Sequence, residues 1–136
     1  MHICQRQTGS TSVVNVFYES DRIIPSGAVI EHVVEAGIGQ PHIVRRYASC
    51  GTAILSHYAR FGRLSAGLRA GTPDDPGAMR PSAAIFTASR MPWVVLPEGV
   101  PAFEAHYRPS DFLPEASLSR FRALAARQDA LKDVAA

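Results

Sequence analysis

Short apolar runs follow one another along the first two thirds of the chain, and turn-forming residues separate them. Each run is rich in Val, Ile, Phe or Tyr and has the length of a β-strand rather than of a helix. The runs are residues 12–18, 28–35, 42–47, 52–58, 63–70 and 82–88. Because the connections between them are short, the pattern predicts strands that pair antiparallel.

The run at residues 63–70 shows the clearest alternation. Its apolar positions, Leu64, Ala66 and Leu68, alternate with the polar or small positions Arg63, Ser65, Gly67 and Arg69. This period of two predicts a strand with one buried face and one face in water. The Pro- and Asp-rich residues 72–77 that follow predict a turn.

The pattern becomes helical beyond Pro114. Apolar residues recur at helical spacing between charged ones, at Leu118, Phe121, Leu124, Ala125 and Leu131. Asp111 and the Pro114-Glu115 pair suit a first helical turn. We therefore expect a β domain over residues 1–110 and an amphipathic helix and tail over residues 111–136, whose apolar stripe covers the sheet or a second subunit.

Composition limits the classes of protein that this chain can be. The 136 residues, 46% of them hydrophobic, suffice for one core, and no apolar run approaches the roughly 20 residues of a membrane-spanning helix. Residues 1–10 have no apolar stretch typical of a signal peptide, so we expect a soluble cytoplasmic protein. The net charge of +2 is spread over scattered basic residues, which argues against a nucleic-acid or membrane partner.

The two cysteines, Cys4 and Cys50, exclude a disulfide-rich scaffold and a complete four-thiolate zinc site within one chain. A disulfide between them is disfavoured in a cytosolic compartment. Cys4 lies in a polar stretch before the first predicted strand, and Cys50 precedes Gly51 between two strands. A Cys-Gly pair is common at metal-binding turns, although a small buried thiol explains it equally well.

Two further sets of residues are candidates for a site. His2, Cys4, Cys50 and His57 together carry the two thiolates and two imidazoles of a tetrahedral zinc site, although lone histidines are more often surface or satisfied core groups.

Arg45 and Arg46, on opposite faces of a predicted strand, are candidate clamps for a carboxylate ligand such as a tripeptide thiol; ordinary surface charge is the alternative. We interpret residues 91–93, which include the single Trp93, as a packed corner rather than a ligand platform.

Five short motifs stand in a defined order between residues 1 and 107. They are residues 4–10 (CQRQTGS), 45–52 (RRYASCGT), 71–76 (GTPDDP), 80–81 (RP) and 91–93 (MPW). In this order and spacing they resemble the glutathione-dependent formaldehyde-activating enzyme family, which includes centromere protein V-like proteins. The resemblance implies a zinc-associated, zinc-ribbon-related β-tent fold and a carbon-sulfur lyase activity that forms or cleaves the adduct of formaldehyde and glutathione.

The chain departs from the metal-binding pattern of that family, which runs Cys-x-Cys, Cys-x-Cys-x-x-Cys and Cys-x-x-Cys-Gly. Cys4 matches the last cysteine of the middle group and Cys50 the last of the third, so two of the seven thiolates remain. Met1 and Tyr47 stand where two others are expected. Either an upstream piece once supplied ligands or this is a metal-poor relative, and Tyr47, which truncation does not explain, favours the second reading.

Two functions of different class follow. The first is a carbon-sulfur lyase in which Cys4 is the catalytic thiol or metal ligand, Arg45 or Arg46 holds glutathione, and zinc is absent or partial. The second is a non-catalytic scaffold that binds a small thiol or a protein partner. In both we expect a homodimer, because loss of the family's opening strands leaves a sheet edge to be covered.

Overall fold

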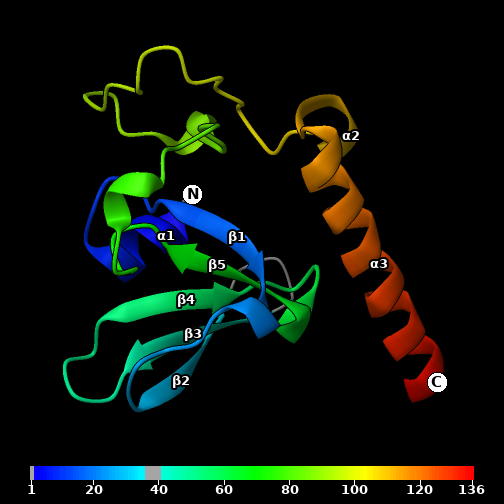
Figure 1. The fold of residues 1–136 in the computed structure, drawn as a ribbon. Helices are drawn as coiled ribbons and strands as arrows, with labels where there is room; N and C mark the ends of the chain where they lie inside the picture. The colour runs from blue at the N-terminus through cyan, green and yellow to red at the C-terminus, as the bar shows by residue number, and fades with distance from the viewer. Residues whose placement is uncertain (1, 36–40) are drawn as a thin grey trace.

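A single antiparallel sheet forms the body of the molecule. In the computed structural model, which describes residues 2–35 and 41–136, five strands pair in the order β1-β5-β4-β3-β2. The strands are β1 (Asn15–Glu19), β2 (Val29–Val34), β3 (His42–Tyr47), β4 (Ala53–His57) and β5 (Ser65–Arg69), and every pairing is antiparallel. Figure 1 shows α3 (Glu115–Ala135) standing beside the sheet. The expected mainly antiparallel β domain with one C-terminal helix is confirmed.

The core lies where the central strands β4 and β5 meet. Ile54, Leu55 and Ala66 form a buried cluster, and partly buried apolar side chains pack against it from neighbouring segments. Val44 on β3 is also fully buried.

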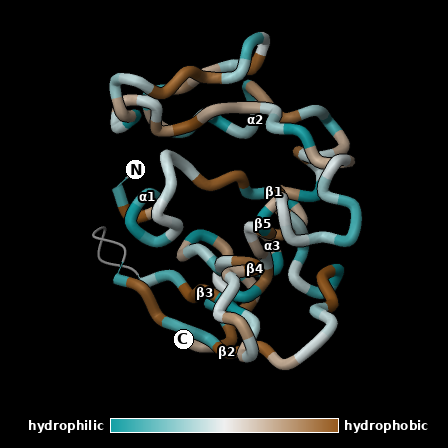
Figure 2. Tube along the Cα trace, turned by 90° about the vertical axis from the view of Figure 1, so that its left-hand side faces the viewer, coloured by the Kyte–Doolittle hydropathy of each residue, from teal (hydrophilic) through white to brown (hydrophobic). Residues whose placement is uncertain are grey.

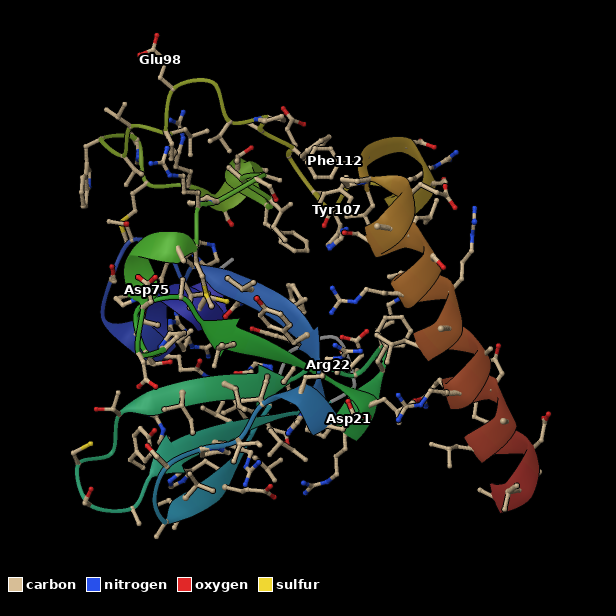
Figure 3. All side chains as sticks on the ribbon, in the orientation of Figure 1. Asp21, Arg22, Asp75, Glu98, Tyr107 and Phe112 are labelled. Carbon is tan, nitrogen blue, oxygen red and sulfur yellow. The ribbon has the colours of Figure 1, made fainter. Side chains whose placement is uncertain are left out.

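The C-terminal helix packs beside the 58–64 connection and the end of β1. Phe121 of α3 meets Phe61 edge to face at 5.1 Å, and Leu118 and Leu124 are buried. Arg120 donates two hydrogen bonds to the carboxylate of Glu19. Arg127 lies 3.8 Å from Asp21, which projects toward the helix in Figure 3. A short helix, α2 (Pro109–Phe112), precedes α3.

A long connection over residues 79–108 forms a layer above α1 and the sheet, and Figure 2 shows hydrophobic stretches along it. The predicted strand at residues 82–88 is wrong. Only an isolated bridge joins Ala84 to Ala102, and a 3-10 turn, η4 (Thr87–Ser89), follows. Phe86 has the left-handed φ of 56°, which interrupts an extended run.

The prediction for residues 63–70 is wrong in two respects. The strand starts at Ser65, after the 3-10 turn η2 (Gly62–Leu64), and both of its faces are covered. Ser65 and Arg69, expected in water, are buried, and Arg69 lies against α1, where it donates a hydrogen bond to Gln7.

A helix not expected from the sequence, α1 (His2–Thr8), precedes β1. Gln and Arg are good helix formers, and Gly9 ends the helix with the left-handed φ of 62°. Among the described residues, no helix is long and apolar enough to cross a membrane.

Candidate functional site

Two polar regions lie against α1, each on a different face of the helix. Gln5 and Arg6 follow His2 by three and four residues and so share one face of α1; together with Gly9, directly after the helix, these residues line an open hollow. Gln7, on another side of the helix, bonds to residues of the sheet. One short helix therefore takes part in both regions.

The α1 hollow has a volume of about 600 Å³ and lies between α1, the segment that follows it and the loop around residue 92. Its lining is His2, Gln5, Arg6, Gly9, Ser10, Thr11, Met91 and Trp93. The amide of Gln5 donates to the carbonyl oxygens of Thr11 at 3.3 Å and Ser89 at 3.2 Å, which ties the helix to the segment that follows it and to the 3-10 turn η4.

Trp93 is not part of a packed corner, as the sequence suggested, because the residue is 71% exposed and lines the α1 hollow. Met91 lies beside it in the lining. The hollow thus combines an apolar wall with the exposed guanidinium of Arg6 and the hydroxyls of Ser10 and Thr11. Such a lining suits a small anionic ligand that also carries an apolar or sulfur-containing part.

A buried arginine, Arg69, lies under α1 at the end of β5. It is 7% exposed, and its guanidinium donates to Asn15 Oδ1, to Gln7 Oε1 at 2.8 Å and to Ser56 Oγ at 2.8 Å. All three acceptors are neutral, and Nε of Arg69 has no hydrogen-bond partner among the described residues. The Arg69 cluster, defined as Arg69, Gln7, Asn15 and Ser56, therefore fastens α1 to three strands through one cation.

Two rings extend this polar region. Nε2 of His42 lies 3.3 Å from Nε2 of Gln7, and the ring packs against Tyr58 with centroids 5.3 Å apart. Burial first, and the Arg69 charge second, lower the pKa of His42, which keeps this imidazole neutral near pH 7. Tyr58 accepts a 2.9 Å hydrogen bond from Asn15, and its ring lies over Gly67, where a Cβ would come within 2.9 Å.

Cys4 is half-buried on α1. Burial raises the pKa of its thiol, and the positive charge of Arg69 opposes that rise without overcoming it. The thiol is therefore predominantly protonated near pH 7, which is unlike an activated nucleophile.

Cys50 lies exposed in the turn between β3 and β4. The Thr52 hydroxyl, 3.2 Å from its Sγ, is the main cause that lowers the pKa of this thiol. Among the described residues, neither cysteine takes part in a disulfide.

The candidate clamps, Arg45 and Arg46, both bind groups on neighbouring segments of the sheet. Nε of Arg45 lies 3.6 Å from Glu31, which also receives two hydrogen bonds from Arg63. Arg46 donates to the carbonyl oxygen of Gly51 at 2.9 Å. Neither residue lines the α1 hollow.

The predicted zinc ligands do not fit a single metal ion. Cys50 precedes β4 and His57 ends it, so at about 3.3 Å per residue the strand alone separates them by about 13 Å. Zinc needs ligand atoms within about 2.3 Å of the ion. Nδ1 of buried His57 is 3.0 Å from the Ser65 carbonyl oxygen, and Nδ1 of His2 is 3.2 Å from Gln5. Within residues 2–35 and 41–136 no three His, Cys, Asp or Glu side chains form a metal-binding group.

The residues that sequence reasoning missed are those of the Arg69 cluster together with Trp93. The pattern of residues 63–70 placed Arg69 on the wetted face, since alternation distinguishes two faces but does not show what covers them. Gly9 was the available signal for α1, because a glycine directly after a polar, helix-compatible stretch is a common helix terminator.

Comparison with known proteins places the chain among its relatives. The model of the family described as glutathione-dependent formaldehyde-activating enzyme matches residues 2–89, which include α1, the whole sheet and all four residues of the Arg69 cluster. The chain belongs to this family. No curated protein matches the chain significantly, and no solved structure does. The match ends just before Met91, so the apolar wall of the α1 hollow lies outside the matched region.

Proposed function

We propose that this member of the formaldehyde-activating family binds a small peptide thiol of the glutathione type in the α1 hollow. The observation that carries the proposal is the pairing of Arg6 with Trp93 across a hollow of about 600 Å³. A guanidinium binds a carboxylate through charge-assisted hydrogen bonds, and the aromatic and thioether surfaces of Trp93 and Met91 suit the apolar and sulfur parts of such a ligand.

The family relationship supports a ligand of this class, because glutathione dependence is part of the family's description. The predicted clamps Arg45 and Arg46 are held by Glu31 and Gly51, so Arg6 is our preferred partner for the ligand carboxylate. We also propose a cytoplasmic location, a compartment in which thiols are kept reduced.

The second candidate function is the carbon-sulfur lyase chemistry of the family, which the family match favours. In that reaction the thiol sulfur bonds to the carbonyl carbon of formaldehyde, and the thiol proton passes to the carbonyl oxygen. Because the described residues form no metal-binding group, we derive no step through zinc. We propose that binding, rather than turnover on a zinc held by this chain, is the retained property.

The test uses Trp93 as a reporter, since the chain has one tryptophan. Reduced glutathione should change the Trp93 fluorescence saturably, and Arg6→Ala should weaken binding tenfold or more, which is about 1.4 kcal/mol. Arg122→Ala is the matched control, because this exposed arginine on α3 lies outside the hollow and should leave binding unchanged. An unchanged affinity in Arg6→Ala would refute the proposed site.

A parallel measurement addresses zinc. Protein purified without added zinc should hold clearly less than one metal ion per chain, and a chelator should leave the thermal unfolding midpoint unchanged. One zinc per chain, lost together with stability on chelation, would restore the lyase as the first candidate.

A further inference from the structure

The strand β2 leaves its outer edge unpaired by any strand of the described chain. It lies at one end of the order β1-β5-β4-β3-β2 and forms the lower edge of the sheet in Figure 1. Its inner edge pairs with β3 along its whole length. The outer edge therefore presents backbone N–H and C=O groups that another strand can bind.

The hydrogen bonds show which residues present those groups. The N–H of Ala48 donates to the carbonyl oxygen of Ala28 at 2.9 Å, whereas the N–H of Tyr47 donates to Thr52 on the opposite side of β3. Val29 is the partner of Tyr47, so this pair is not hydrogen-bonded across the β2–β3 ladder. Since such pairs alternate, Val29, Glu31 and Val33 direct their N–H and C=O groups outward.

Nothing in the sequence of β2 protects this edge. The strand reads VIEHVV, without the proline or lysine that commonly block edge-to-edge pairing. Ile30 is 45% exposed and Val33 is 67% exposed. The one acidic side chain of β2, Glu31, forms ion pairs with Arg63 and Arg45 of its own chain.

We propose that β2 pairs antiparallel with β2 of a second copy and joins two five-stranded sheets into one. A second copy is the occupant because β2 is complementary to itself. With the twofold axis at His32, Ile30 lies opposite Val34 of the partner subunit and Glu31 opposite Val33 of the partner subunit. Each pairing of Ile30 with Val34 of the partner subunit joins two apolar β-branched side chains, and such pairs stabilise a sheet.

Charge selects this register over its neighbour. With the axis at Glu31, the two Glu31 carboxylates would stand directly opposite each other, which destabilises an antiparallel pair. With the axis at His32, no like-charged carboxylates oppose each other within β2. The His32 pair is then not hydrogen-bonded and has Cα atoms about 4.5 Å apart.

The first test measures the association of the full chain by sedimentation velocity over a concentration series. We expect a monomer–dimer equilibrium that Val33→Pro weakens roughly thirtyfold, because both outward Val33 N–H donors of the dimer are lost at about 1 kcal/mol each. Val33→Lys, which keeps the backbone donors and adds like charge, should also weaken the dimer. Val95→Lys is the control, since Val95 is 89% exposed outside the sheet.

The second test fixes the register by cross-linking. In a background of Cys4→Ser and Cys50→Ser, His32→Cys should form a disulfide between subunits, because a separation near 4.5 Å suits one. Glu31→Cys should cross-link more slowly. A monomer at all concentrations, a dimer indifferent to both Val33 variants, or faster cross-linking through Glu31→Cys would overturn the proposal as stated.

Discussion

Arg69 offers the sharpest test of how the sheet and α1 are held together. Replacing it by methionine keeps an unbranched apolar stem and removes the guanidinium. Three acceptors then lose their donor: Ser56 Oγ, Asn15 Oδ1 and Gln7 Oε1. Two opposing effects decide the outcome, namely the loss of these hydrogen bonds and the relief of a buried, uncompensated charge.

The burial of each acceptor sets the first effect. Ser56 is fully buried, so its hydroxyl cannot turn to water, and losing its partner costs about 1–3 kcal/mol. The partly buried amides of Asn15 and Gln7 can rehydrate, and we assign them about 0.5–1 kcal/mol each. The gross loss is thus about 2–5 kcal/mol.

The second effect reduces that loss, because Arg69 has no carboxylate partner among its contacts and its desolvation is unfavourable. We expect the loss of the hydrogen bonds to outweigh the relief of desolvation, so that Arg69→Met is destabilised by about 2 kcal/mol. For a domain of this size that is a fall of about 7 °C in the unfolding midpoint.

The assay is urea unfolding followed by circular dichroism, with thermal unfolding alongside. Arg22→Met is the matched control: its exposed side chain reaches Glu19 only at 3.8 Å, and its loss should change stability by less than about 0.5 kcal/mol. Equal or greater stability of Arg69→Met would show that desolvation outweighs the three hydrogen bonds and would refute the reasoning.

Three further predictions concern single side chains. The hydrogen bond from Arg120 is the main cause that lowers the pKa of Glu19 from its usual 4.5 to about 2. The stabilisation of the fold by this ionised carboxylate is therefore complete above about pH 5 and is lost as the pH falls toward 2. Because Arg120 is 47% exposed, we expect only about 1 kcal/mol, measured as the urea stability of wild type minus Glu19→Gln at pH 6. At pH 2, where Glu19 is about half protonated, this difference should be much smaller. Gly67→Ala should lose about 2 kcal/mol in urea unfolding, since the new Cβ would lie 2.9 Å from the Tyr58 ring; wild-type stability would contradict the packing. Cys50 should react with a disulfide reagent at pH 7 well before Cys4, as mapped by mass spectrometry, and the reverse order would contradict their exposures and pKa directions.

The strands could be predicted where local pattern and tertiary pairing agree. The run at residues 42–47 became β3 with the same bounds, and the apolar spacing after Pro114 became α3. In both segments the local periodicity agrees with the contacts that the rest of the chain provides. The run at residues 82–88 has strand composition but finds only one bridge, at Ala84, since β pairing depends on a partner that composition does not reveal.

The candidate site could be predicted only in part. The motif at residues 4–10 indicated an important N-terminal segment, and four lining residues of the hollow belong to it, namely Gln5, Arg6, Gly9 and Ser10. The Arg69 cluster depends on three chain segments meeting under α1, and no local pattern of residues encodes that meeting. The exposure of Trp93 likewise depends on how the long 79–108 connection lies, which hydrophobicity alone misjudged.

The central claim is that a small peptide thiol binds in the α1 hollow. The most direct measurement is a titration of the isotope-labelled protein with reduced glutathione, followed through the backbone amide signals. We predict saturable shifts concentrated at Gln5, Arg6, Ser10, Thr11 and the Trp93 indole, with the β3–β4 turn unaffected. Saturable shifts centred on Arg45, Arg46 and Cys50, or no shifts at saturating glutathione, would contradict the account.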